Sequence, residues 1–442
     1  MTGYLGPSRL LDRGSDSELA LATALGLTPG GVVDHPRFFS GFLARPEVVA
    51  AGLLALADVA AARYVDPSFS LLALDPVITA GGTMLRAESF SACNGVYARL
   101  DLDGESFDTG EIGFGTTNVA LNDPLRTALA GLRRTELVRL EVGADGLSLE
   151  TPDQAHVERK VKLPDRWVRG FAETPVIAAA MRHVATLTRP QATNLLVGLP
   201  NGTPPGPTLH LAQAPGGLRP VPRAAAGAVR LAGTRRLTAY RRLLRFFTRL
   251  DVYAYDGGAS AWVFALPGGA FTLMLSPEPY RGFSGEGGLL HDLARAGGAT
   301  DQDDVAGELL PLLAWQQRLD PDELATYAGV PVTAVRHGLG VVAASGRLGF
   351  DLTARTYFHR ELPLDAKRVE KDNPRLKAAR ALVAGGAVVA TEGGWRVTGP
   401  KSVHWVRGDA ARPSCTCLWW AKYAGSRGPC KHVLAVQLLT GR

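Results

Sequence analysis

The chain has 442 residues, of which 46% are hydrophobic and 20% are charged, and its formal net charge is +6. This composition is typical of globular protein and excludes extensive disorder, and the 4 cysteines are too few for a disulfide scaffold. The N-terminus lacks a basic-then-apolar signal pattern, and Asp58 interrupts the longest apolar helical stretch before it reaches the roughly 18 residues that a membrane span needs. We therefore expect a cytoplasmic protein without membrane contact, and the length predicts two to four domains.

The patterns along the chain predict a multidomain α+β fold. Residues 1–70 are expected to form a helical segment, because Ser15 begins a capping-box pattern and Arg45-Pro-Glu precedes an apolar run at helical spacing. Residues 71–189 change to short runs of alternating polarity separated by Asp-Gly or glycine-rich turns, which are typical of β-hairpins, with one helix starting near residue 123. This part is predicted to be an α+β module. Cys93 within it is expected to be a buried free thiol.

The same order of elements recurs after a stretch rich in proline and glycine. Residues 190–222 are predicted to be a linker, and residues 223–300 a second α+β module related to the first. In both modules an Arg-Gly-Phe sequence follows an Asp-Gly turn, 24 residues on at Arg169 and 25 residues on at Arg281. The order helix, strand, hairpin, strand resembles one repeat of a sliding-clamp-like fold, although it carries no residue motif of that family. The two arginines either contact equivalent ligands or stabilise the fold.

Residues 301–366 resemble a winged-helix domain. The expected elements are helices at 303–319, 322–328 and 331–344, followed by a hairpin up to residue 360. The third helix of such a domain usually enters the DNA major groove. However, the segment has 5 Arg and no Lys against 10 Asp and Glu, a net charge of −5, and this helix offers only Arg336 and His337. Because phosphates repel an acidic surface, we favour a structural or protein-binding role over direct reading of DNA.

Basic charge is concentrated at the C-terminal end. Residues 367–442 contain 14 Lys and Arg against 4 Asp and Glu, a net charge of +10, which leaves −4 for the first 366 residues. Residues 367–389 are predicted to be a basic connector to a final domain. Its lysines, Lys371 and Lys377 among them, belong either to a solvated helix face or to an arm that contacts phosphates.

Three of the four cysteines lie near the C-terminus in the pattern Cys415-x-Cys417, twelve residues, Cys430-x-His432. Three thiolates and an imidazole are a standard ligand set for structural Zn²⁺. Alternation along a strand lets the first two cysteines face one ion, and the apolar run after Lys431 predicts a helix whose N-terminus favours a thiolate at Cys430. We predict a closed zinc site in a β-β-β-α unit. The alternatives are four unliganded side chains or a disulfide within the odd set of cysteines.

This pattern, preceded by Trp395-Arg-Val-Thr and His404-Trp-Val-Arg where two strands are expected, resembles the SWIM-type zinc finger over residues 390–442. The resemblance implies that zinc is held by Cys415, Cys417, Cys430 and His432. It also implies DNA or protein as the partner, and no catalysis. Bacterial proteins of this type are associated with AAA ATPase and von Willebrand A partners, and the Arg-, Ala- and Gly-rich composition is typical of a GC-rich bacterial genome.

Aromatic and basic residues are interleaved around the cysteines, a mixture that suits stacking with bases and pairing with phosphates. Trp419 and Trp420 are expected on a strand, with at least one facing inward. The candidate nucleic-acid contacts are Trp420, Lys422, Arg427 and Lys431 in the finger and Lys371 and Lys377 in the connector.

The sequence contains no Walker A, G-x-S-x-G or H-E-x-x-H motif. We therefore expect a non-enzymatic zinc-binding protein whose finger and connector bind nucleic acid, with DNA favoured over RNA. The alternative is a protein-protein adaptor in a bacterial complex with an AAA ATPase, in which the finger is a structural or protein-binding module.

Overall fold

A computed structural model describes residues 37–64, 76–144, 146–159, 165–283, 318–343, 346–360, 374–400, 402–408, 412–425 and 428–440, together with four short strands before residue 34. Those four strands form two antiparallel hairpins, β1 (Arg9–Arg13) with β2 (Asp16–Ala20) and β3 (Gly26–Thr28) with β4 (Gly31–Val33). The helix predicted after Ser15 is therefore wrong. A capping-box pattern is a local signal, and here strand pairing overrides it.

The body of the molecule is built on an eight-stranded antiparallel sheet. Its strands are, in spatial order, β10 (Phe114–Asn118), β6 (Val77–Gly81), β7 (Leu85–Phe90), β8 (Val96–Leu102), β20 (Gly269–Leu275), β19 (Ser260–Leu266), β18 (Arg249–Ala254) and β14 (Arg182–Thr188). The pairing of β8 with β20 joins strands that are more than 160 residues apart in the chain. The sheet therefore fuses the two predicted modules into one layer.

A five-stranded antiparallel sheet stands beside this layer. Its order is β13 (Ala155–Arg159), β12 (Gly146–Glu150), β11 (Arg139–Gly143), β5 (Arg37–Leu43) and β9 (Phe107–Ile112). The strand β5 falls in the segment expected to be helical, because the partners that stabilise it, β9 and β11, lie far along the chain.

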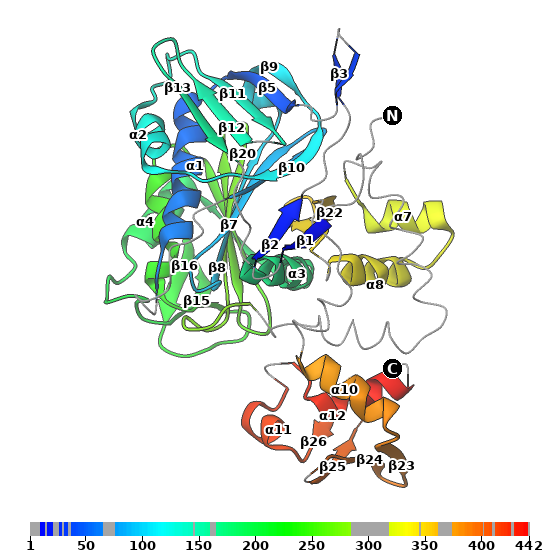
Figure 1. Cartoon of the computed structure of the whole chain (residues 1–442). Helices are drawn as coiled ribbons and strands as arrows, with labels where there is room; N and C mark the ends of the chain where they lie inside the picture. Colours follow the sequence, from blue (N-terminus) through cyan, green and yellow to red (C-terminus); the bar gives the residue numbers. More distant parts are fainter. Residues whose placement is uncertain are drawn as a thin grey trace.

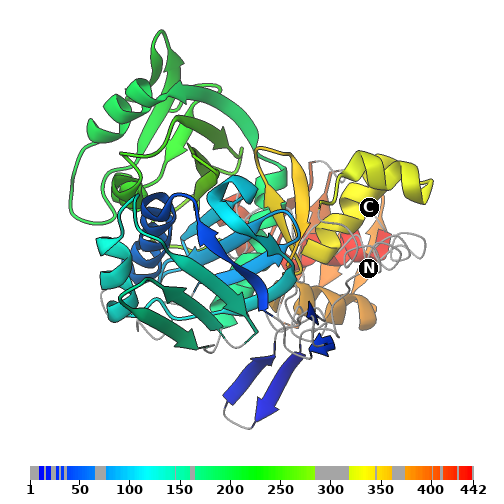
Figure 2. The same cartoon turned by 90° about the horizontal axis from the view of Figure 1, so that it is seen from above.

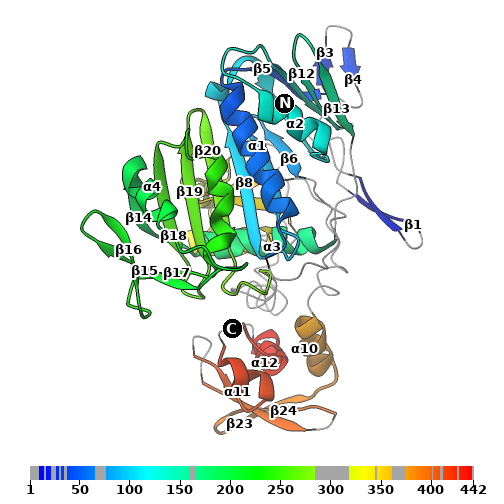
Figure 3. The same ribbon diagram turned by 90° about the vertical axis from the view of Figure 1, so that its left-hand side faces the viewer.

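Alternation along the strands gives the large sheet two chemically different faces. On β8, Val96, Ala98 and Leu100 belong to the main apolar core, whereas Tyr97, Arg99 and Asp101 point to the opposite face. The apolar face is covered by the helix α1 (Pro46–Ala61), which crosses β7 and β8 (Figure 3). Most of α1 is buried, since α2 (Asp123–Gly131) and the 3₁₀ helix η2 (Thr234–Arg242) flank it.

The predicted linker is instead part of the second module. Residues 190–222 contain most of α4 (Arg189–Val197) and the strands β15 (Leu209–Ala214) and β16 (Gly217–Val221), which form a three-stranded sheet with β17 (Val229–Leu231). The proline- and glycine-rich sequences lie in the turns between these elements, so they mark changes of direction within the fold rather than a connection between domains.

The two Arg-Gly-Phe sequences have different local structures and yet meet in space. The first lies in α3 (Asp165–Ala179), and the second follows β20 in a turn. Their phenylalanines are both fully buried against Phe90, with ring centroids 5.0 Å away for Phe171 and 6.4 Å away for Phe283. The two phenylalanines thus share a place in the core on the second face of the sheet. The equivalence of the two arginines stays a prediction.

Residues 318–360 cover that second face together with α3. They contain α7 (Pro321–Ala328), α8 (Val332–Ala343) and the hairpin β21 (Leu348–Asp351) with β22 (Thr356–His359), close to the predicted bounds. Figure 2 shows this unit on the far side of the body from α1. The predicted helix at 303–319 lies almost wholly outside the described residues, and the winged-helix resemblance stays a prediction.

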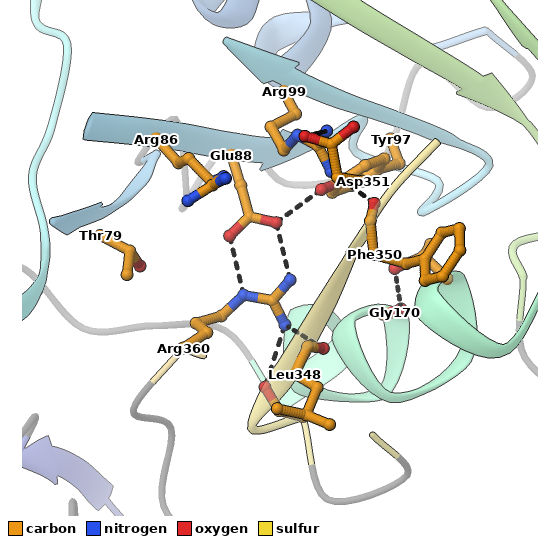
Figure 4. Close-up of polar contacts among 12 residues, drawn as sticks. Thr79, Arg86, Glu88, Tyr97, Arg99, Gly170, Leu348, Phe350, Asp351 and Arg360 are labelled. Carbon is orange, nitrogen blue, oxygen red and sulfur yellow. Dashed lines mark hydrogen bonds and ion pairs between the residues drawn. The ribbon is translucent and has the colours of Figure 1, made fainter. Parts of the chain in front are cut away.

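Buried charges fix the hairpin to the sheet (Figure 4). Arg360 donates to both carboxylate oxygens of Glu88 on β7 at 2.7 Å, and both side chains are fully buried. Its guanidinium also lies 4.2 Å from the ring centroid of Phe171. On β8, Arg99 pairs with Asp101 at 2.8 Å and donates to the Phe350 carbonyl on β21 at 2.7 Å. The unit is thus bonded to the sheet through its own backbone and side chains.

The C-terminal domain lies below the body in Figure 1. Its elements are α10 (Pro374–Ala384), β23 (Val388–Thr391), β24 (Gly394–Thr398), β25 (Val403–Arg407), β26 (Ser414–Cys415), α11 (Leu418–Tyr423) and α12 (Lys431–Thr440). The four strands form one antiparallel sheet in chain order. Compared with the predicted β-β-β-α unit, the domain has a fourth short strand and two further helices, α10 and α11, and Trp419 and Trp420 lie on α11 rather than on a strand.

No helix within the described ranges combines the length and apolarity needed to cross a membrane.

Candidate metal centre

Three short elements of the C-terminal domain bring the four predicted ligands together. Cys415 ends β26, Cys417 is the N-cap of α11, and Cys430 and His432 stand at the start of α12. All four side chains are buried, and one ligand atom from each lies within 4.8 Å of the others. The strand position expected for Cys417 is replaced by a helix cap, which still turns its sulfur toward Cys415.

The spacing of these atoms fits one zinc ion. The Cys415 Sγ and His432 Nδ1 atoms are 3.7 Å apart. Tetrahedral Zn²⁺ with bonds of roughly 2.3 Å to sulfur and 2.0–2.1 Å to nitrogen would separate two such ligands by about 3.6 Å. The donor set and the separation together identify Nδ1 as the His432 ligand atom for Zn²⁺.

The surroundings favour a thiolate at one of the three cysteines, Cys430, whereas burial raises the pKa of Cys417. A hydrogen bond from Cys415, followed by contacts with His432 and the Val433 N–H, lowers the pKa of Cys430 to about 4, although burial opposes this. The same contact with Cys430, together with burial, raises the pKa of Cys415. Backbone N–H groups at the starts of α11 and α12 also point at sulfur, from Trp420 to Cys417 and from Val433 to Cys430, each at 3.4 Å. A dication that displaced the thiol protons would bind all three sulfurs at once.

His404 supports the ligand histidine and was not singled out as part of the site by the sequence. It lies on β25, and its ring stacks on that of His432 with centroids 4.2 Å apart. Burial and the neighbouring His432 lower the pKa of His404, so it favours the neutral form, and its Nε2 is 2.8 Å from the Ser402 hydroxyl. The Nε2 atom of His432 is buried and has no hydrogen-bond partner in the described part of the chain. Stacking on His404 therefore helps to orient the ligand ring.

From Pro374 onward, the predicted connector belongs to this domain. Leu376 and Ala379 of α10 pack on Leu434 and Leu438 of α12. Arg375 lies over the ring of Trp419 at 4.4 Å and donates to the Pro429 carbonyl at 2.9 Å, directly before Cys430. The sequence presented α10 as a charged stretch because Arg375, Lys377 and Arg380 are spaced along it, although Leu376 and Ala379 between them are buried.

The six predicted nucleic-acid contacts fall into two groups. Lys377 on α10 and Lys422 on α11 are exposed, whereas Trp420 and Lys431 are half-buried near the metal ligands. Trp420 packs against the cluster that contains the cysteines, so much of its ring is committed to the fold. Lys371 and Arg427 lie outside the described residues.

Of the comparisons with known proteins, the one with family models agrees with this centre. A family model described as the SWIM zinc finger matches residues 395–438. No curated protein matches the chain. Among solved structures, the PCNA2-PCNA3 complex from Sulfolobus tokodaii has 10% sequence identity and a TM-score of 0.40, covering 54% of this chain and 98% of that chain. Proliferating Cellular Nuclear Antigen from Entamoeba histolytica has 10% identity and a TM-score of 0.36, covering 55% of this chain and 100% of that chain.

Proposed function

We propose that this protein is a non-enzymatic, zinc-binding protein whose SWIM finger and α10 bind nucleic acid, with DNA favoured over RNA. The zinc ion is structural in this proposal. Four protein ligands close the site and leave no position for a substrate, which is the arrangement of a fold-stabilising zinc rather than a catalytic one.

The observation that carries the proposal is the excess of positive over negative charge in this domain. Its described residues between 374 and 440 include eight Lys and Arg and a single carboxylate, Glu392 in the β23–β24 turn. The eight are Arg375, Lys377, Arg380, Arg396, Arg407, Arg412, Lys422 and Lys431. Phosphates are attracted to such a surface, and each neutralised phosphate releases counterions, so binding should weaken steeply with salt.

The test is a titration of the full-length zinc-loaded protein with DNA and RNA oligonucleotides over a range of salt concentrations. We expect log K to fall linearly with log salt. A Lys377→Ala/Lys422→Ala double variant, which changes two exposed residues away from the ligands, should weaken binding and reduce the slope by about 2. Arg336→Ala on α8 is the matched control and should leave binding unchanged. If the wild-type protein fails to bind at low salt, nucleic-acid binding is wrong.

A protein-protein adaptor is the second candidate, and the acidic start of α7 favours it, where Asp322 and Glu323 occupy the first turn. Tyr327, one helical turn after Glu323, is 76% exposed. An exposed tyrosine among acidic residues suits a basic protein partner better than a nucleic acid. This reading includes assembly with an AAA ATPase, as the resemblance implies. The adaptor is favoured if the protein does not bind nucleic acid and if a protein partner that binds the wild type fails to bind the Tyr327→Ala variant.

A further inference from the structure

The sheet of the finger has an outward face whose side chains do not contribute to the metal centre. Along β24 and β25, Val397 and Val406 point inward and are buried beside the cysteines, so their neighbours Arg396 and Trp405 point outward. The strand register places Arg396 directly opposite Trp405 on one side and Val389 on the other. The outward residues of β23 to β25 are Val389, Arg396, Thr398, Val403, Trp405 and Arg407, and we call this surface the outer sheet face.

Trp405 is the exposed tryptophan of the finger. Trp395, Trp419 and Trp420 all pack against the cysteine cluster, whereas 38% of the surface of Trp405 is accessible. Two hydrogen bonds hold the backbone of Trp405 to Thr416. The Trp405 N–H donates to the Thr416 hydroxyl at 3.0 Å, and the Trp405 carbonyl accepts from the Thr416 N–H at 3.1 Å. The indole therefore projects from a hydrogen-bonded strand. Its bonding partner, Thr416, directly follows the ligand Cys415.

We propose that the outer sheet face is a stacking platform for the bases of single-stranded nucleic acid, with Trp405 at its centre. This inference rests on the proposed function and names the form of nucleic acid and the residue that distinguishes it. It also moves the aromatic contact away from Trp420, which the fold already uses.

The chemistry of the face selects this ligand over others. Arg396 and Arg407 flank the indole on the same side of the sheet, and Glu392, the only carboxylate among the described residues of the finger, lies at the end of the β23–β24 hairpin. Guanidinium groups beside an aromatic ring suit a phosphate backbone with an unstacked base. A duplex hides the faces of its bases, so it could use the charges but not the ring. An acidic protein could also use the charges and place an aromatic side chain on the indole, so a protein contact that Trp405→Ala abolishes is an outcome that contradicts the platform.

The experiment uses the full-length, zinc-loaded protein with oligo-dT and with a blunt duplex of equal length. Trp405→Ala should weaken binding of the single strand about 10- to 100-fold with an unchanged salt slope. Binding of the duplex should change little. Trp405→Phe should recover most of the affinity, because a smaller ring still stacks. Leu418→Ala is the matched control, since Leu418 is 89% exposed on α11 away from this face, and it should bind as the wild type does.

A second measurement does not depend on how the variants fold. An oligonucleotide containing 2-aminopurine should lose fluorescence on binding to the wild-type protein, because stacking on the indole quenches it. Two results would contradict the stacking platform and leave the proposed nucleic-acid binding intact. One is single-strand binding without quenching, and the other is a Trp405→Ala variant with wild-type affinity and full zinc content. Equal losses for duplex and single strand would also overturn it, as would a protein dimer that Trp405→Ala dissociates. If no oligonucleotide binds at low salt, the proposed function itself fails.

Discussion

Replacement of Cys430 by serine should unfold the C-terminal domain and leave the body folded. Cys430 is 1% exposed and connects the metal to the first turn of α12, where its sulfur accepts the Val433 N–H. Without this ligand zinc retains two sulfurs and one imidazole. Loss of this ligand therefore destabilises α12, the helix on which α10 packs.

The magnitude follows from how little else holds the domain together. Its buried aliphatic side chains larger than alanine are Leu376, Val397, Val406, Val433, Leu434, Val436 and Leu438. A structural zinc ion contributes on the order of 10 kcal/mol or more to folding, whereas the whole net stability of a domain is about 5–15 kcal/mol. Loss of the zinc contribution would match or exceed the net stability of a domain this small, so we expect the C-terminal domain to be unfolded at room temperature.

Hydrogen exchange of the full-length protein measures this directly. Cys430→Ser, or removal of zinc by a chelator, should abolish protection in α10, α12 and the finger strands while β8 and β20 keep theirs. Metal analysis should find one zinc per chain in the wild type. Cys93→Ser is the matched control, because Cys93 is the cysteine outside the site, and it should retain both zinc and protection. Native protection of α12 in a metal-free protein would refute the reasoning.

Three further predictions concern the body. Glu88→Gln should destabilise it by about 3–5 kcal/mol because it leaves the Arg360 charge buried without its partner, and a denaturant double-mutant cycle with Arg360→Met should be strongly non-additive. Burial would raise the pKa of Glu88, but Arg360 outweighs it and holds that pKa below 4.5. The stabilising effect of the pair is therefore present at neutral pH and lost as pH falls through the lowered pKa, so the difference between wild type and Glu88→Gln in unfolding midpoint should shrink in acid. Gly170→Ala should cost about 1–3 kcal/mol, since its Cβ would lie 2.5 Å from the Phe90 ring, whereas Gly131→Ala, with nothing within 4 Å, should leave the melting temperature nearly unchanged.

The zinc site could be predicted from the sequence because its ligands lie close together in the chain. Cys415 and His432 are 17 residues apart, and few chemistries other than metal binding need three cysteines and a histidine in such a span. His404 was missed because stacking has no sequence signature, and the ring it supports lies on a different element. The ligands, which depend on spacing along the chain, could therefore be predicted from the sequence. The supporting histidine, which depends on packing, could not.

The larger fold was harder to predict from the sequence for the same reason. Glu88 and Arg360 are 272 residues apart, and each looks like an ordinary surface charge when its own strand is read alone. The helices α1, α7 and α8 were predicted nearly to their ends, because caps, prolines and apolar spacing are local. The strand β5 and the sheet positions of β15 and β16 were missed, since strands gain their stability from partners that the local sequence does not reveal.

The helix α3 explains why the effects of zinc loss should stop where we predict. Its residues Ala172 and Val176 pack against the cluster formed by α10 and α12, so α3 connects the body with the C-terminal domain. The other side of α3 is anchored independently, because Trp167 and Phe171 are fully buried and stack edge-on with Phe90 on β7. Unfolding of the finger would expose only the two small contacts and leave the aromatic anchor in place. Protection in α3 should therefore fall at its Val176 end and persist at Phe171 when zinc is removed.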